Sequence, residues 1–352
     1  MGAETTLLHL AAEPATWIPH YAGSGHTARA SPAESDDPLR RLDLTGLDTV
    51  AIGSIVNEFD ALLVAGSAPL IYLRTAEVCG VLRAVTVPRV LGIYFPFEEV
   101  EFYAGPGEAR TLARRVGSMV PHCDHVVVPS RYARADLARW VRSARHVEVV
   151  PLGADFAPNA VMPMEPRRVV VVSRSGPLAI HKNLSDLVGA FVLARRKVPD
   201  LRLDVIGDVD RSLSKYEGLR LLGNLSELDR QYELSGAGFS ASASGIEAFG
   251  LSIAEAMRAG VPVVAARAGA VPELITHERS GLLVDSSNRR MEVNGRTVTS
   301  LRPDIAAFSG AMCRLAQDRE LRFRLSHQSC LETAQLTWEA CARRYLEALF
   351  SS

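Results

Sequence analysis

Apolar runs of strand length alternate with amphipathic stretches of helix length along most of this chain of 352 residues. The alternation favours parallel sheets covered by helices, because each parallel strand needs a helix-length crossover before the next one. At roughly 150 residues per domain, the length predicts two domains. We therefore predict an α/β protein with two doubly wound, Rossmann-like domains. The expected strands span residues 6–10, 49–52, 61–64, 89–94, 125–128, 147–150, 168–173, 202–206, 219–222, 238–240, 261–265 and 282–284. The expected helices span residues 70–85, 107–120, 133–141, 184–198, 227–235, 251–259 and 271–276.

Prolines interrupt this pattern near the middle of the chain, in the linker from Ala154 to Pro166, at Pro158, Pro163 and Pro166. Because proline lacks a backbone donor and breaks helices, the stretch predicts an extended hinge. We place the first domain at residues 1–158 and the second at residues 159–336. The polar stretch 286–302 has no apolar period, and we expect it to form a mobile surface loop or lid.

The charges of the chain nearly cancel, with 39 basic and 40 acidic residues. The chain therefore lacks the excess positive charge that favours binding to nucleic acid or to an anionic membrane. Only three of the basic residues are lysines. Together with abundant alanine and arginine, this composition is typical of a GC-rich, actinobacterial source.

The five cysteines are odd in number, widely spaced and without a Cys-x-x-Cys pair. They predict neither a disulfide framework nor a zinc site. The most apolar stretch, residues 61–73, is broken by Gly66 and Pro69 and is too short to span a bilayer, and no charged-then-apolar leader opens the chain. We expect a soluble cytoplasmic protein without stable membrane insertion. A homodimer is compatible with the sequence.

Two glutamates stand eight residues apart around the predicted start of a helix. Glu247 precedes Phe249, Gly250 and Leu251, beside helix N-terminal amides that suit polar or anionic ligand atoms. Glu255 lies about one turn further in, on an otherwise apolar helix. One carboxylate would accept sugar hydroxyls and the other ribose hydroxyls. The alternative is a pair of solvated glutamates, and spacing alone does not decide between the two.

A second group of polar residues follows the first predicted strand of the second domain. Arg174 stands at the end of that strand, and Lys182 stands just before the next helix. Doubly wound domains bind ligands at strand ends and helix N-termini, and two fixed cations there would neutralise a diphosphate. The alternative is an exposed basic loop. We interpret the neighbouring His181 as a loop residue rather than a catalytic base.

An Asp-x-Asp pair at Asp208 and Asp210 matches a metal chelate in composition. It directly follows Gly207 at the end of a predicted strand, which favours a strand-end turn instead. We therefore predict no metal ligand and expect arginine, lysine and helix amides to stabilise charge.

The segment 245–257, with Glu247 and Glu255, continues into Gly260-Val261-Pro262 and closely resembles the Glu-x7-Glu region of retaining GT-B glycosyltransferases of family 4. The resemblance covers roughly residue 61 to the C-terminus. Further similar segments are residues 123–130, 149–155, 217–223, 268–275, 281–284 and 337–346.

The resemblance implies a GT-B fold whose second domain binds a nucleotide-diphospho-sugar of the UDP or GDP type, a co-substrate, with no further cofactor. The family's catalytic positions match Glu247, Arg174 and Lys182, of which the two cations hold the leaving diphosphate. Its donor-binding positions match Gly245, Phe249, Gly250, Leu251, Glu255, Gly207 and Asp208. The last helix, at residues 337–352, resembles the one that crosses back onto the first domain and makes that domain discontinuous.

The first domain is expected to bind the acceptor. A glycine-rich loop in the family approaches the diphosphate and acceptor, and Gly23 and Gly25 are our candidates for it, with a flexible loop as the alternative. Where the family often carries a sugar-contacting histidine, this chain has Tyr94 or Phe95. The identity of the sugar is therefore left open.

An acidic run that includes Glu98 and Glu99 follows the expected strand 89–94, where it would border the ligand-binding edge. Residues 1–160 hold 14 arginines, no lysine and 18 acids, a net charge of 14 − 18 = −4. This charge favours a soluble, amine-bearing acceptor such as an aminocyclitol or another secondary-metabolite core over a lipid surface. The alternative for the acidic run is a solvated loop.

Together with these features, the resemblance implies a retaining glycosyltransferase that moves a hexose-type sugar to a hydroxyl of a soluble small-molecule acceptor. Two alternatives stay open. One is a pseudo-glycosyltransferase that couples a cyclitol, and the other is a non-catalytic GT-B protein that acts as an interaction subunit.

Overall fold

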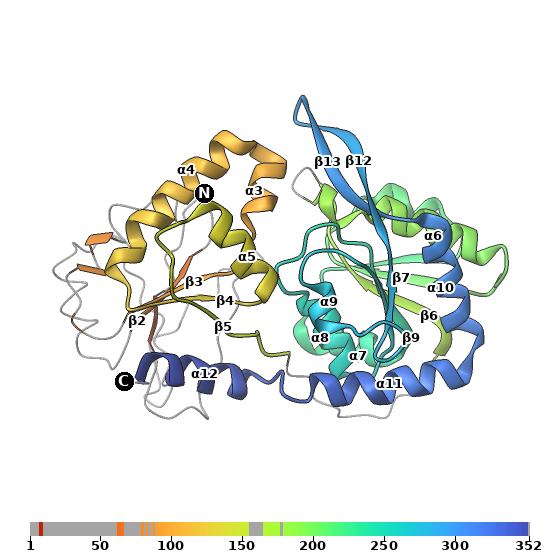
Figure 1. Ribbon diagram of the computed structural model, residues 1–352. Coiled ribbons are helices and arrows are strands. Elements are labelled where there is room, and N and C mark those ends of the chain that lie inside the picture. Colours follow the sequence, from red (N-terminus) through yellow and green to blue (C-terminus); the bar gives the residue numbers. More distant parts are fainter. Residues whose placement is uncertain are drawn as a thin grey trace. The chain divides into compact units, whose positions relative to one another are not determined.

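The computed structural model describes residues 7–9, 62–66, 79–80, 82–83, 86, 89–154, 165–176 and 179–350. The chain divides into two compact units, Met1–Gly153 with Thr337–Ser352 and Ala154–Leu336. The boundary thus follows Gly153 instead of residue 158, and the C-terminal residues return to the first unit. Each unit has a sheet accompanied by helices (Figure 1). The expected strand 49–52 and most of the expected helix 70–85 lie outside the described residues.

The sheet of the first unit has the strand order β1-β2-β3-β4-β5. Its strands are β1 (Leu7–His9), β2 (Leu62–Gly66), β3 (Arg89–Ile93), β4 (His125–Val128) and β5 (Val147–Val149). β2 to β5 run parallel, as predicted. β1 instead pairs antiparallel with β2, so the expectation of a wholly parallel sheet was wrong at this edge. An antiparallel edge strand is common on an otherwise parallel sheet.

Helices of the first unit pack against this sheet through an apolar core. They are α3 (Phe97–Ala104), α4 (Pro106–Met119), the short η2 (Val120–His122), α5 (Arg131–Trp140) and α12 (Trp338–Phe350). Leu91 and Val126 of the sheet share one buried cluster with Phe97 of α3, Leu112 of α4 and Leu137 of α5. Helix α3 was not predicted, because the glutamates of its first turn follow directly on the buried Phe97 and were interpreted as an acidic loop.

Helix α12 packs in a separate cluster of the first unit. Its Tyr345 is 1% exposed and contacts a group that includes Val127 of β4 and the neighbouring Val150. A Cβ on Gly153 would lie 2.4 Å from the backbone nitrogen of Trp338, so only glycine permits this close approach. The last helix is therefore built into the first unit.

The six-stranded sheet of the second unit has the order β11-β10-β9-β6-β7-β8 and is parallel throughout. Its strands are β6 (Glu165–Val172), β7 (Arg202–Ile206), β8 (Leu219–Gly223), β9 (Ala237–Ser242), β10 (Val263–Ala266) and β11 (Leu282–Val284). Its helices are η3 (Ile180–Lys182), α6 (Leu184–Arg195), η4 (Arg211–Lys215), α7 (Glu227–Ser235), α8 (Leu251–Arg258), α9 (Val271–Leu274), α10 (Ile305–Gln317) and α11 (Arg319–Thr333). The chain builds outward from β6 to β8 and then returns to place β9 on the other side of β6. This reversal is the switch point at which doubly wound sheets bind ligands.

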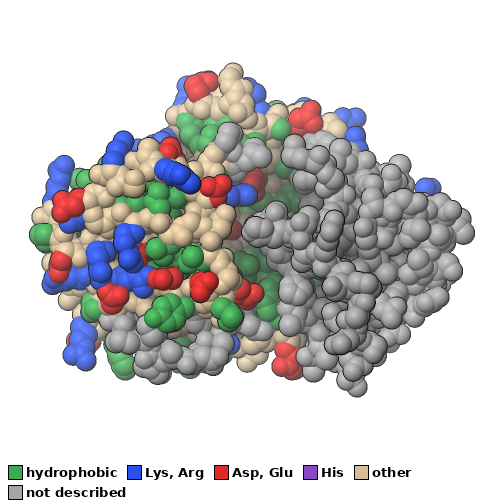
Figure 2. All heavy atoms as spheres, turned by 180° about the vertical axis from the view of Figure 1, so that it is seen from behind, with side chains coloured by type: hydrophobic (Ala, Val, Ile, Leu, Met, Phe, Trp, Pro, Cys, Tyr) green, Lys and Arg blue, Asp and Glu red, His purple; other side chains and the backbone are tan. Residues whose placement is uncertain are grey.

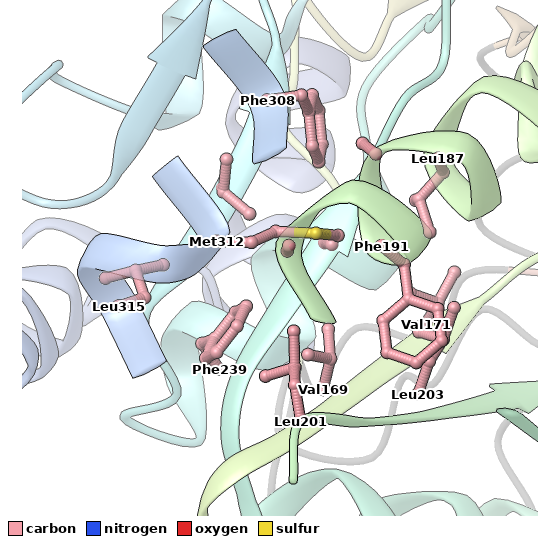
Figure 3. Close-up of a cluster of buried hydrophobic side chains, with 14 of the residues drawn as sticks. Val169, Val171, Leu187, Phe191, Leu201, Leu203, Phe239, Phe308, Met312 and Leu315 are labelled. Atoms are coloured by element: carbon pink, nitrogen blue, oxygen red, sulfur yellow. The ribbon is translucent and has the colours of Figure 1, made fainter. Parts of the chain in front are cut away.

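Strand β6 buries both of its faces, which explains its unbroken run of valines. Val169 and Val171 contribute to one cluster with Phe191 of α6 and Phe308 of α10 (Figure 3). Val170 belongs to the cluster on the other side, with Met257 of α8. The central strand is therefore packed between two helical layers, and its carboxyl end is held in a fixed place.

Three expectations for the second unit need correction. The stretch 286–302 is an antiparallel hairpin, β12 (Ser286–Val293) and β13 (Arg296–Pro303), and not a loop. Its serines, threonines and arginines give no alternation of apolar and polar residues, the pattern that predicts a strand, because one face of the hairpin is polar. Pro166 lies in β6 and not in the hinge. The pairing of β6 with β9 shifts register between Glu165 and Val169, and proline is tolerated at such an irregularity because it cannot donate a ladder hydrogen bond. Helices α10 and α11 were not predicted.

The charged side chains are mixed over the described surface. Figure 2 shows Lys and Arg side chains interspersed with Asp and Glu over the described part of one face. This agrees with the near-zero formal net charge of −1. Among the described residues, no helix is both long and apolar enough to cross a membrane.

Candidate functional site

Two loops of the second unit meet where its strand order reverses. One follows β6 and leads through η3 to Lys182, and the other follows β9 and carries Glu247. Lys182 Nζ lies 2.9 Å from Glu247 Oε2. Both side chains are partly accessible, with exposed fractions of 25% and 17%. The structure thus brings together a cation and a carboxylate that the sequence predicted as separate features.

Backbone contacts hold Glu247 in place. The Gly245 N–H donates to the carbonyl of His181 at 2.7 Å, which ties the two loops together. The Ala270 N–H donates to the carbonyl of Glu247 at 2.9 Å. Gly269 has φ 53°, and a Cβ there would lie 2.4 Å from the same carbonyl. The main chain of Glu247 is therefore held between the loop before α6 and the loop after β10.

His181 lies beneath these charges, with 1% of its surface exposed. Burial, together with the positive charges of Lys182 and Arg174, lowers the pKa of its imidazole to about 3. His181 is therefore neutral at physiological pH. Arg174 itself is exposed at the end of β6. Its charge, like that of Lys182, disfavours the protonated form of His181.

Glu255 lies in α8 and is 8% exposed. Its carboxylate forms an ion pair with the guanidinium of Arg230 in α7. Burial raises the pKa of Glu255, and the charge of Arg230 opposes that shift. Sequence reasoning missed Arg230. The available signal was a single basic residue in α7, a helix otherwise rich in acids.

The start of α8 provides backbone donors. Gly250 is the N-cap, with φ 95°, and no side chain caps this helix. The Ile253 N–H donates to the Gly250 carbonyl at 3.0 Å, and the amides of Leu251 and Ser252 before it suit an anionic or polar ligand. Phe249 is buried, and Leu251 at the first helical position is partly exposed. The start of α8 lies close to the Glu247 side chain, since a Cβ on Gly250 would lie 3.6 Å from Glu247 Cγ.

The loop after β7 packs closely against the loop after β6. A Cβ on Gly207, which has φ 119°, would lie 1.9 Å from the carbonyl oxygen of Ser173. Asp208 is exposed, and its carbonyl accepts from the Ser175 N–H at 2.9 Å. Asp210 instead caps η4, since its Oδ1 accepts from the backbone N–H of the second η4 residue at 2.8 Å. Within the part of the chain that the structure describes, no three His, Cys, Asp or Glu residues are grouped so that they could hold a metal ion.

Two of the acceptor-side candidates lie in the described part of the first unit with clear partners. The hydroxyl of Tyr94 hydrogen-bonds the hydroxyl of Tyr345 in α12, and a Cβ on Gly92 would lie 2.5 Å from the Tyr94 hydroxyl oxygen and 2.7 Å from its ring. The carboxylate of Glu98 accepts a hydrogen bond from the hydroxyl of Tyr132. Tyr94 thus helps to hold the last helix, and its contact with a ligand stays a prediction.

The acidic first turn of α3, with Glu98 and Glu99, is fixed by α5. Asp136 Oδ2 accepts from the Phe97 N–H at 2.5 Å. Burial raises the pKa of Asp136 to about 6. Gly23 and Gly25, the expected glycine-rich loop, lie outside the described residues.

Residues 160–295 match the family described as Glycosyl transferases group 1. That segment contains Arg174, Lys182, Glu247 and Glu255. The chain is 28% identical over 274 residues to a GDP-mannose-dependent alpha-(1-6)-phosphatidylinositol monomannoside mannosyltransferase of Mycobacterium tuberculosis, covering 68% of this chain and 64% of the relative. It is 29% identical to a D-inositol 3-phosphate glycosyltransferase of Segniliparus rotundus, covering 48% of this chain and 43% of the relative. The match therefore spans less than two thirds of the length of these relatives.

Solved structures show the fold class. HepE from Anabaena, solved with UDP and glucose, has a TM-score of 0.66 at 17% identity and covers 86% of this chain and 81% of its own. Sucrose-phosphate synthase from Thermosynechococcus elongatus has a TM-score of 0.64 at 18% identity, with coverages of 84% and 75%. The chain therefore has the predicted GT-B fold of two Rossmann-like domains.

The Arg230–Glu255 pair generates a stability prediction. Arg230→Ala should lower the free energy of unfolding by on the order of 3 kcal/mol, because it leaves a buried carboxylate unpaired. The second substitution Glu255→Gln should recover most of this loss. Without Arg230, the folded-state pKa of Glu255 rises further above its unfolded value, so the folded state binds more protons. The loss of stability should therefore grow as pH rises above the unfolded pKa of glutamate.

Urea unfolding at pH 5 and pH 8 would measure this effect. Arg202→Ala is the matched control, since Arg202 pairs with Glu165 while both are about half exposed, and it should cost less than about 1 kcal/mol. An Arg230→Ala effect equal to that of the control at both pH values would contradict the prediction.

Proposed function

We propose that this protein is a retaining glycosyltransferase that moves a hexose-type sugar from a UDP- or GDP-linked donor to a hydroxyl of a soluble small-molecule acceptor. The observation that carries the proposal is the 2.9 Å contact of Lys182 with Glu247 at the switch point of the second unit. This unit contains the segment that matches group 1 glycosyltransferases. The donor is a co-substrate, and we propose no further cofactor.

The proposed roles follow from charge and position. Arg174 and Lys182 neutralise the diphosphate as the bond to the anomeric carbon breaks and negative charge develops on the leaving oxygen. Glu247 accepts hydrogen bonds from sugar hydroxyls and aligns the anomeric carbon for attack. Its ion pair keeps the Lys182 side chain directed at the same place. Retention follows if the acceptor hydroxyl attacks from the face of the leaving group, whose phosphate oxygen takes the proton, so that no protein base is required.

Glu255 has a different role in this proposal. It lies deeper than Glu247 and is ion-paired with Arg230, so it suits a contact that persists throughout the reaction. Ribose hydroxyls meet this condition, because they do not change along the reaction coordinate. The buried pair fixes the carboxylate oxygen that would accept them.

For the acceptor, we propose a cyclitol core that carries an amine. The names of two relatives include inositol 3-phosphate and phosphatidylinositol monomannoside, both of which contain a cyclitol. The first turn of α3 adds two carboxylates, Glu98 and Glu99, which favour a cationic group. An aminocyclitol or a related secondary-metabolite core has both properties.

Glu247→Gln should lower turnover of the donor by about two powers of ten, because a contact that orients the anomeric centre is weakened. Glu255→Ala should instead mainly weaken nucleotide binding. Steady-state kinetics together with calorimetric nucleotide titration would separate the two effects. Glu320→Gln, an exposed substitution in α11, is the control. Turnover of Glu247→Gln equal to that of the control would remove Glu247 from the site.

Activity should survive EDTA, because Arg174 and Lys182 supply the positive charge that a divalent cation supplies elsewhere. The capping role of Asp210 supports this expectation. The measurement is initial rate before and after chelation, with magnesium and manganese added back. Loss of activity that either ion restores would show that the leaving group is stabilised by metal.

The acceptor class can be tested by competition between substrates. With a donor that the enzyme hydrolyses slowly, an aminocyclitol should be glycosylated faster than the matching neutral cyclitol, and Glu98→Gln/Glu99→Gln should reduce that preference. Thermal shift confirms that the double variant is folded. A preference for cyclitol lipids in vesicles over both soluble acceptors would contradict the proposal.

A further inference from the structure

The base of the β12–β13 hairpin contacts both loops of the candidate donor site. The carbonyl oxygen of Leu301 in β13 accepts a hydrogen bond from Asn183 Nδ2 at 2.9 Å. The same oxygen lies where a Cβ on Gly245 would come within 2.2 Å of it. Asn183 directly follows Lys182, and Gly245 stands two residues before Glu247. One carbonyl of the hairpin therefore limits the position of both loops.

Asn183 joins the three segments through a single amide group. Its Nδ2 also donates to the carbonyl of Ala243 in the Glu247 loop, again at 2.9 Å. The side chain is 3% exposed, and the residue has φ 49°. Asparagine suits this position because it tolerates the left-handed region and offers two amide protons, both of which are used here.

A second anchor lies one residue further along β13. The guanidinium of Arg302 pairs with the carboxylate of Asp186 through two nitrogens. Asp186 is 6% exposed and stands in the first turn of α6, directly after η3. A two-point pair of this kind fixes orientation as well as distance. The hairpin is thus attached to the helix that begins beside Lys182.

The outer part of the hairpin has one packed face, on which Val293 and Val298 are buried, and one exposed face. Arg290 lies opposite Thr299, and both are exposed. In Figure 1 the hairpin extends away from the sheet and helices of its unit. A two-stranded hairpin alone is marginally stable in water. The Asn183 and Arg302 contacts attach its base, and the site loops share those contacts.

We propose that the base of the hairpin is a positioning element of the donor site, with Asn183 and Arg302 as positioning residues. The Leu301 carbonyl, through Asn183 and against Gly245, holds the Lys182 loop beside the Glu247 loop. The consequence for catalysis rests on the proposed function, but the mechanical link does not. Neither Asn183 nor Arg302 needs to touch the donor.

Hydrogen exchange of the full chain without nucleotide tests the mechanical link. Asn183→Gly keeps access to the left-handed backbone and removes both amide donations. It should raise exchange in segments 179–184 and 243–250 by about tenfold. Arg290→Gln, on the exposed face of the same hairpin, should leave both segments unchanged. Unchanged exchange of segment 243–250 in Asn183→Gly would overturn the inference.

Two further variants test the same link in case the Asn183→Gly protein is generally destabilised. Gly245→Ala places a methyl group against the Leu301 carbonyl and should loosen the same two segments. Its matched control is Gly310→Ala in α10, where a Cβ meets no atom within 4 Å. Arg302→Gln should loosen the segment 179–184 through the other anchor. If Gly245→Ala and Arg302→Gln both exchange like the wild type, the inference is wrong.

Steady-state kinetics test whether the contact between the hairpin base and the two loops matters for catalysis. Asn183→Asp keeps the size of the side chain and its tolerance of the left-handed region but cannot donate. Both Asn183→Asp and Asn183→Gly should lower kcat about tenfold or more while the donor KM changes less, since alignment and not contact is lost. A wild-type kcat in Asn183→Asp would overturn the positioning role. A wild-type protein that turns over no nucleotide sugar would instead contradict the proposed function, and the exchange result would still decide the mechanical link.

Discussion

The adjacency of β6 and β9 is the constraint on which the candidate site depends. The chain adds two strands, β7 and β8, outward from β6 before it returns, so the loops after β6 and β9 open side by side although Lys182 and Glu247 are 65 residues apart. Both strands are packed between helical layers, and their carboxyl ends cannot move apart without opening the core. The 2.9 Å contact between the two side chains is a direct consequence.

Close backbone approach completes the geometry around this point. Gly207 lies against the carbonyl of Ser173, and Gly269 lies against that of Glu247, both with positive φ. A side chain at either position would separate two loops that both border the site. Gly245 has the same relation to Leu301. Glycine is needed here for space as much as for backbone freedom.

The two glutamates illustrate how environment separates similar groups. Glu247 is ion-paired with a lysine and partly exposed, so it can reach a ligand that enters from solvent. Glu255 is buried against Arg230, and its raised pKa reflects loss of water. The first suits a group whose geometry changes in the reaction, and the second suits one that stays constant.

The sequence by itself determined the architecture and the candidate residues. Apolar periodicity sufficed for the parallel strands from β6 to β11, because burial on both faces leaves an unbroken apolar run such as Val169–Val172. Apolar periodicity did not predict helix α3 or the hairpin, because each has a polar or acidic face that interrupts the apolar pattern. The role of Arg230 was not predicted, because an isolated arginine in the sequence does not indicate which acidic residue it pairs with. Only the tertiary structure decided that Lys182 meets Glu247, that Arg230 meets Glu255, and that Leu301 touches the loops that carry Lys182 and Glu247. These contacts join residues between 25 and 118 positions apart, and their formation depends on strand order and packing that no local pattern encodes.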